Sequence, residues 1–164
     1  TARDLQGKPL QHQPLRVVLD SYCRTPIEAK LLREPGTTII ATTQDAPALL
    51  VARMETAGAE VYVGPAGQDG RVDLQSLLAE LGHRGVVSLL AEGGGGILGS
   101  LFDAGLVDKV FAFIAPSIIG GGDAPSPVAG QGTSLMSEAW RMERAQMRQI
   151  GPDWLITGYP AARS

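Results

Sequence analysis

The chain has 164 residues, a formal net charge of −3 and a hydrophobic fraction of 44%, values typical of one soluble globular domain. This charge gives no electrostatic basis for nucleic-acid binding, and no apolar run approaches the ~20 residues of a membrane span. A single cysteine, Cys23, leaves no internal disulfide and no multi-cysteine metal site, and it suits a reducing cytoplasm. Glycine is in excess, since 21 of the 164 residues are glycine and the usual share is about 7%.

Apolar and β-branched runs predict seven strands, over residues 16–20, 37–43, 60–63, 86–91, 110–115, 144–150 and 154–159. The run over 86–91 is apolar at nearly every position, as expected for a strand covered on both faces. The last two runs are separated by Gly151, Pro152 and Asp153, which predicts an antiparallel hairpin.

Three helices are expected between the strands, over residues 46–57, 74–81 and 97–104. Asp45 and Asp73 are the predicted caps of the first two. Gly58, Gly82 and Gly105 are the predicted ends of the three. The alternation of strands and helices implies an α/β fold, with a largely parallel sheet and helices on both faces. We expect one domain over residues 1–164, with a long Gly/Pro loop over 120–132.

The strongest candidate for chemistry lies between the predicted strand 86–91 and the next helix. Glu92 follows the strand, and Gly93 to Gly96 form a turn into the helix. Ligands of open α/β sheets bind beyond the carboxyl ends of strands, and a helix N-terminus offers free N–H groups to phosphate. The glycines fit G-x-G-x-x-G without the later acidic residue of an NAD-binding Rossmann site. A phosphate cradle and a simple tight turn both stay open, as do a substrate-binding Glu92 and a solvated strand terminus.

Several segments occur in an order that resembles the bacterial riboflavin-pathway pyrimidine reductase, the reductase half of a bifunctional deaminase/reductase. They cover residues 14–21, 24–26, 89–96, 104–108, 114–116 and 120–121. The resemblance implies a dihydrofolate-reductase-like three-layer α/β/α fold with a mostly parallel mixed sheet and a C-terminal antiparallel hairpin. It implies NADPH-dependent reduction of 5-amino-6-(5-phosphoribosylamino)uracil to the 5-phosphoribitylamino product.

The resemblance also implies roles for individual residues. Glu92 matches a catalytic and substrate-binding glutamate, and Arg3 matches an arginine that binds the substrate phosphate, a task suited to a guanidinium. The residues matched to NADPH binding are Ser21, Gly94, Gly95, Gly96, Ile97, Leu98, Gly99 and Ser100. Asp20 is expected to form a turn, and no metal ligand is expected.

Other expectations concern the whole protein. The resemblance implies a cytoplasmic homodimer with an upstream zinc deaminase domain. The family's first strand, with its lysine, and a family aspartate would precede Thr1, so residues 1–164 alone are expected to be inactive. Two alternatives stay open: a dihydrofolate-reductase-like reductase of another pterin or pyrimidine, and a non-catalytic nucleotide-binding domain.

Some other residues have two possible roles, and others are expected to have only a structural role. Arg24, Thr42 and Thr43 either meet the 2′-phosphate of the cofactor or are solvated loop residues. Glycines 120–122 either approach the cofactor or form a bare loop. We expect His12 and His83 at the surface, Trp140 and Trp154 in packing contacts, and no catalytic role for Cys23.

Overall fold

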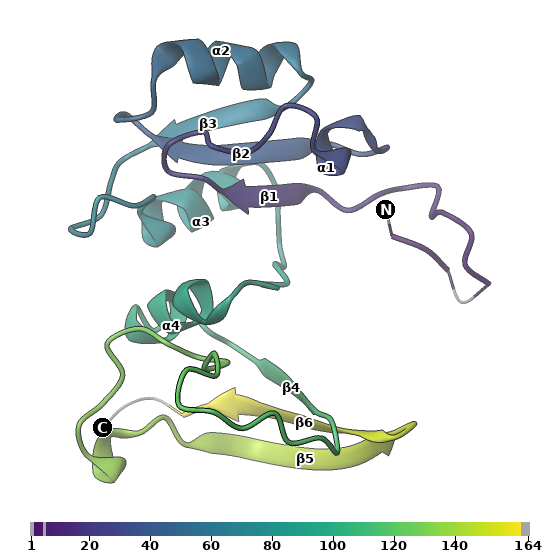
Figure 1. Ribbon diagram of the computed structural model, residues 1–164, viewed down its shortest axis with the longest axis vertical. Coiled ribbons are helices and arrows are strands. Elements are labelled where there is room, and N and C mark those ends of the chain that lie inside the picture. The colour runs from purple at the N-terminus through teal and green to yellow at the C-terminus, as the bar shows by residue number, and fades with distance from the viewer. Residues whose placement is uncertain (1, 5, 162–164) are drawn as a thin grey trace. The chain divides into compact units, whose positions relative to one another are not determined.

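The computed structural model describes residues 2–4 and 6–161, and it divides into two compact units, Thr1–Val87 and Ser88–Ser164. The first unit contains β1 (Arg16–Leu19), α1 (Lys30–Arg33), β2 (Thr38–Thr43), α2 (Ala48–Thr56), β3 (Glu60–Gly64) and α3 (Leu74–His83). The second contains α4 (Gly95–Asp103), β4 (Val110–Ile114), the short 3-10 helix η1 (Met136–Glu138), β5 (Met142–Ile150) and β6 (Asp153–Pro160) (Figure 1). That residues 1–164 act as one reductase domain stays a prediction.

The first unit is a parallel sheet in the order β1-β2-β3, with helices on both faces (Figure 1). Every residue of β2 is buried, and its side chains alternate between two cores. Ile39 packs with Leu77 and Leu81 of α3. Ile40, on the opposite face, packs with Met54 of α2. The predicted α/β class, with a parallel sheet covered on both sides, is therefore confirmed in this unit.

The short helix α1 was not predicted, and Arg16 explains how it is held. The Arg16 guanidinium donates hydrogen bonds to four backbone carbonyls and one hydroxyl, those of Leu31, Glu34, Pro35, Gly36 and Thr38. Carbonyls at a helix C-terminus have no partner within the helix, and a guanidinium offers five donors in a fixed plane. One side chain of β1 therefore ends α1 and ties it to β2.

The helix boundaries confirm some predicted signals and correct others. Asp73 caps α3, and its carboxylate accepts a hydrogen bond of 2.8 Å from the Ser76 amide. Asp45 is not a cap, because α2 begins after Pro47 without a side-chain cap. Gly82 lies inside α3, and Gly85 with φ +82° takes the left-handed position beyond it. Gly58 and Gly105, the predicted ends of two helices, each lie two residues after the last residue of α2 and α4 and have positive φ.

The second unit contains an antiparallel sheet in the order β4-β6-β5, and the predicted hairpin is confirmed. The turn between β5 and β6 contains Gly151 with φ +59°. Arg144, with φ +48°, lies at an irregularity in the β5–β6 register, as expected for a bulge. Among the described residues, the parallel strands pair as one three-stranded sheet and the antiparallel strands as another.

The predicted strand over residues 86–91 is wrong. These residues have no regular secondary structure, and Val87 and Leu90 are 98% and 72% exposed. A strand forms only where its N–H and C=O groups pair with a neighbour. Neither sheet of the described residues includes this segment. An apolar run therefore predicts the tendency to form a strand, but not the presence of a partner.

Thr42 is a buried polar residue whose replacement should stabilise the protein. Its side chain is inaccessible to solvent, and its hydroxyl has no hydrogen-bond partner among the described residues. An unsatisfied buried hydroxyl costs on the order of 1 kcal/mol or more. We expect Thr42→Val, which keeps the shape, to raise the free energy of unfolding by about 1 kcal/mol in urea titrations.

Thr43→Val is the matched control for this prediction. The Thr43 hydroxyl donates a hydrogen bond of 2.9 Å to the Ser21 carbonyl, so its removal should lower the free energy of unfolding. Equal effects of the two substitutions would contradict the assignment.

Candidate functional site

At the N-terminus of α4, the first amide groups have no hydrogen-bond partner in the described part of the chain. The N-cap residue is Gly94, whose carbonyl accepts hydrogen bonds from Ile97 and Leu98 at 3.0 and 3.2 Å. The amides of Gly95 and Gly96 precede these donors, so they have no partner within the helix. A Cβ added to Gly94 or Gly96 would meet no atom within 4 Å. An anion can therefore approach the backbone here, where the helix dipole also favours negative charge.

The other side of α4 is covered by its own chain. The Gly95 carbonyl accepts a hydrogen bond of 2.9 Å from the Ala129 amide. A Cβ on Gly95 would overlap the Ser126 carbonyl oxygen, and one on Gly99 would overlap the Ala129 carbonyl. The glycine cluster thus has two roles. Gly95 and Gly99 allow close packing of the loop, and Gly94 and Gly96 leave the helix end open.

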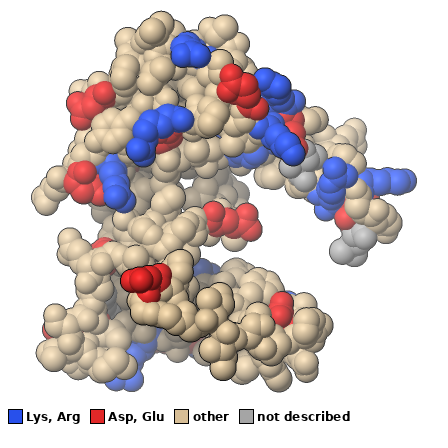
Figure 2. Space-filling view, viewed as in Figure 1, with Lys and Arg blue, Asp and Glu red and all other residues tan. Residues whose placement is uncertain are grey.

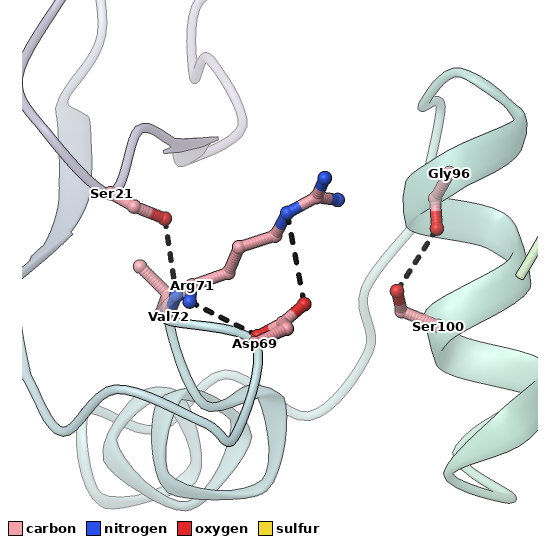
Figure 3. Close-up of polar contacts among 6 residues, drawn as sticks. All are labelled: Ser21, Asp69, Arg71, Val72, Gly96 and Ser100. Atoms are coloured by element: carbon pink, nitrogen blue, oxygen red, sulfur yellow. Dashed lines mark hydrogen bonds and ion pairs between the residues drawn. The ribbon is translucent and has the colours of Figure 1, made fainter.

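The remaining α4 residues matched to NADPH binding lie further into the helix. Ile97 and Leu98 are half-buried. The Ser100 hydroxyl donates a hydrogen bond of 3.0 Å to the Gly96 carbonyl (Figure 3). Ser100 lies in the second turn of the helix, and its hydroxyl hydrogen is used within α4. The open end of α4 is therefore formed by Gly94 to Gly96 and not by the whole run to Ser100.

Ser21 lies in the first unit, directly after β1 and the turn-forming Asp20. The Ser21 hydroxyl oxygen accepts a hydrogen bond of 3.2 Å from the Val72 amide (Figure 3). The Ser21 carbonyl accepts another hydrogen bond, from the Thr43 hydroxyl. These bonds join the ends of β1 and β2 to the loop before α3. The Ser21 hydroxyl keeps its own hydrogen available for donation to a ligand.

The loop before α3 also carries an exposed ion pair. The Asp69 carboxylate accepts a hydrogen bond of 3.0 Å from the Arg71 amide and lies 3.7 Å from the Arg71 guanidinium (Figure 3). On the face shown in Figure 2, such acidic and basic side chains are interspersed among uncharged ones.

A tight turn holds Ser21 in place. The buried Asp20 carboxylate accepts hydrogen bonds from the Thr25 amide at 2.6 Å and the Thr25 hydroxyl at 2.7 Å. Within the turn, Cys23 is buried and has φ +52°, which is uncommon outside glycine. The prediction that Asp20 forms a turn is confirmed. The thiol of Cys23 packs in the core beside Ile40.

The two residues matched to substrate binding are both exposed. Glu92 lies two residues before the α4 N-cap, in the segment without regular structure, so its predicted place at a strand end is wrong. Its carboxylate has no hydrogen bond within the described residues. Arg3 lies on a turn in which its guanidinium donates a hydrogen bond of 2.7 Å to the Gly7 carbonyl. Thr1, two residues before Arg3, lies outside the described residues.

The family follows from comparison of the whole sequence with known families. The model of the RibD C-terminal domain matches residues 1–156. The chain belongs to the RibD C-terminal domain family. The resemblance found in the sequence is therefore confirmed.

Individual relatives agree with this family. The chain is 35% identical to the riboflavin biosynthesis protein RibD of Actinobacillus pleuropneumoniae, over 90% of the chain and 39% of that protein. It is 37% identical to the 2,5-diamino-6-ribosylamino-4(3H)-pyrimidinone 5′-phosphate reductase of Methanothermobacter thermautotrophicus, over 87% of the chain and 64% of that protein. The chain thus spans less than two thirds of each of these relatives.

Solved structures of the RibD family share the fold. Acinetobacter baumannii RibD superimposes with a TM-score of 0.77 at 22% identity, over 96% of this chain and 40% of that chain. The riboflavin biosynthesis reductase Rib7 of Saccharomyces cerevisiae gives a TM-score of 0.69 at 14% identity, over 90% of this chain and 65% of that chain. These likenesses confirm the α/β fold of the RibD reductase structures.

Burial decides the alternatives for Thr42 and Thr43 but not those for Arg24 and glycines 120–122. Thr42 and Thr43 are 0% and 1% exposed, so they are neither solvated loop residues nor ligands of a cofactor 2′-phosphate. Arg24 is exposed and lies 5.8 Å from the centre of the Tyr22 ring. Added Cβ atoms on glycines 120–122 would meet nothing within 4 Å, which fits both a bare loop and an approach to the cofactor.

The histidines and tryptophans differ in their exposure. His12 and His83 are exposed, and the described residues contain no group of three His, Cys, Asp or Glu placed to hold a metal ion. The Trp140 ring packs against Phe102 at 6.1 Å between centroids, whereas Trp154 is 39% exposed.

Among the described residues, no helix has both the length and the apolar character to cross a bilayer.

Sequence reasoning missed the partner of the glycine helix. The Asp103 carboxylate accepts hydrogen bonds from the amides of Gln131 and Gly132, 28 and 29 residues along the chain. No periodicity or capping pattern links such distant positions. The density of glycine in this loop was the sequence signal for a tight backbone contact. In the structure, Gly130 and Gly132 have positive φ.

Proposed function

We propose that the chain is the reductase part of a riboflavin-pathway enzyme that reduces 5-amino-6-(5-phosphoribosylamino)uracil with NADPH. The observation that carries this proposal is the open N-terminus of α4, in a chain of the RibD C-terminal domain family. The unpaired amides and the absence of side chains at Gly94 and Gly96 fit a phosphate of the dinucleotide. When bound, NADPH supplies the hydride that reduces C1 of the ribosyl group in its ring-opened imine form.

The residues of the chain bind and orient the reactants in this proposal. The α4 N-terminus holds a cofactor phosphate, and the Ser21 hydroxyl donates to the cofactor. The Glu92 carboxylate accepts hydrogen bonds from the N–H groups of the pyrimidine. The Arg3 guanidinium binds the phosphate of the substrate, where its planar donor group gives paired hydrogen bonds. Their exposure leaves both Glu92 and Arg3 accessible to a ligand.

Further parts of the proposal concern the whole protein. We place it in the cytoplasm as a homodimer, joined to an upstream zinc deaminase domain as in bifunctional relatives. The much greater length of the RibD relatives supports the additional domain. The free thiol of Cys23 supports a reducing compartment. The exposed aromatic side chains of Phe111 and Phe113 on β4 support burial of this strand against another surface.

The experiment compares the full protein with its Glu92→Gln variant. We expect the wild type to oxidise NADPH in the presence of 5-amino-6-(5-phosphoribosylamino)uracil. Glu92→Gln should lower kcat/KM for the pyrimidine by about 10- to 100-fold, the value of a charged hydrogen bond, and leave the Kd for NADPH unchanged. Glu55→Gln, at an exposed position of α2, is the control that removes the same charge elsewhere.

Three other outcomes would each contradict one part of the proposal. NADPH oxidation with a dihydropterin but not with the pyrimidine would overturn the substrate. Binding of NADPH without reduction of either compound would overturn the enzymatic function. A wild type that does not bind NADPH would overturn the cofactor.

A further inference from the structure

A carboxylate at the C-terminal end of α4 holds the loop that covers this helix. Oδ2 of Asp103 accepts a hydrogen bond of 2.7 Å from the Gln131 amide, and Oδ1 accepts one of 3.3 Å from the Gly132 amide. Asp103 lies eight residues after Gly95 and four after Gly99. The three residues therefore lie on one face of the helix, at intervals of about one turn.

The loop over residues 126–132 follows this face along its length. At the N-terminal end of α4, the Ala129 amide bonds to the Gly95 carbonyl. In the middle, Gly99 packs directly on the backbone of Ala129 and Gly130. At the far end, Gly130 has φ +95°, and a Cβ at this position would overlap the Asp103 carboxylate. Asp103, Gly95 and Gly99 of α4 thus hold the backbone of residues 126–132 directly against the backbone of the helix. We call this arrangement the clip.

The loop residues before the clip lack such anchors. Ile118 and Ile119 are 98% and 93% exposed, and added Cβ atoms on glycines 120–122 would meet no atom within 4 Å. The loop therefore has a held part over residues 126–132 and a bare part before it. The held part contacts the helix that carries the open amides.

We infer that Asp103 is a positioning residue, which holds the loop 126–132 on α4 and so preorganises the N-terminus of this helix for a dinucleotide phosphate. This inference rests on the proposed function. The Ala129–Gly95 bond lies next to the open side formed by Gly94 and Gly96. A loop released from Asp103 would have to be ordered again when the ligand binds, and this ordering would weaken the affinity. Asp103 itself lies two turns from the helix N-terminus and does not contact the phosphate.

The test measures the loop and the cofactor affinity in the same variant. In the full protein, Asp103→Ala should accelerate hydrogen–deuterium exchange of the amides at 131 and 132 by about tenfold. It should raise the Kd for NADPH by about fivefold, and kcat at saturating NADPH should stay within about twofold. Asp103→Asn keeps one acceptor oxygen and should give intermediate values for both the exchange and the Kd.

Two further variants make the result specific. Gly130→Ala should disturb the same clip from the loop side and should reproduce both effects. Asp123→Ala removes the same charge from an exposed position in the bare part of the loop, and it should change neither readout. If Asp103→Ala failed to fold, Asp103→Asn would carry the same comparison.

The remaining outcomes separate this inference from the proposed function. Faster exchange with an unchanged Kd would overturn the positioning role and leave the NADPH-dependent function standing. Unchanged exchange in Asp103→Ala would overturn the clip itself. A wild type that does not bind NADPH would overturn the proposed function, and with it the role of Asp103, although the exchange data would still show the clip.

Discussion

Gly99→Ala is expected to lower the free energy of unfolding of the second unit by about 1–3 kcal/mol, the usual range for an overpacked site. Alanine normally favours a helix over glycine by about 1 kcal/mol, so the sign is opposite to that of the usual substitution. The reason is that Gly99 is buried. The backbone of Ala129 and Gly130 occupies the space that a Cβ at this position would need. Thermal or urea unfolding of the variant measures the change directly.

Gly96→Ala is the matched control within the same helix. An added Cβ at Gly96 meets no atom within 4 Å, so stability should be kept or slightly raised. The new methyl group would lie on the open side of the helix end, and we expect the Kd for NADPH to rise by about tenfold, a change of about 1.4 kcal/mol. A loss of stability in Gly96→Ala, with none in Gly99→Ala, would show that the two faces are assigned the wrong way round.

The first unit was largely predictable from the sequence because its signals are local. The leucines of α3 recur at helical spacing behind the cap residue Asp73, and β2 is a β-branched run with both faces buried. The segment over residues 86–91 has an equally strong apolar pattern and yet forms no strand. Its structure depends on a pairing partner distant in the chain, and periodicity carries no information on such a partner.

The candidate site was predictable in its location but not in its detail. The turn from Gly93 into α4 and the glutamate before it could be found from composition and order. The different roles of Gly96 and Gly99 could not, because they depend on a loop about 30 residues later that has no regular pattern. The same reason hides Asp103, whose partners are backbone amides, which every sequence contains.

Asp20→Asn is expected to lower the free energy of unfolding at pH 7 by about 1–3 kcal/mol, the value of lost hydrogen bonds to a charged group. Asp20 is buried, with 8% of the residue exposed. Burial raises its pKa, but hydrogen bonds from the Arg24 amide, the Thr25 hydroxyl and amide, and the Tyr22 amide outweigh burial, so the pKa lies below its ordinary value. The charged form therefore stabilises the folded state.

The direction of this pKa shift fixes the pH dependence. The unfolded chain takes up a proton near the ordinary aspartate pKa of about 3.9, whereas the folded chain does so only at lower pH. The stabilisation by Asp20 is therefore complete above the unfolded pKa, and it is lost as pH falls through the folded pKa. Urea titrations between pH 7 and pH 2.5 should show a smaller fall in stability for Asp20→Asn than for the wild type.

The control for this prediction is Asp45→Asn, an exposed carboxylate whose predicted capping role the structure does not support. We expect it to leave both the stability at pH 7 and its pH profile unchanged.

Asp20→Asn should also weaken NADPH binding. The substitution releases the turn through Cys23, and this turn holds Ser21 at the end of β1. A variant with wild-type stability at pH 7 and an unchanged pH profile would show that the carboxylate does not hold this turn.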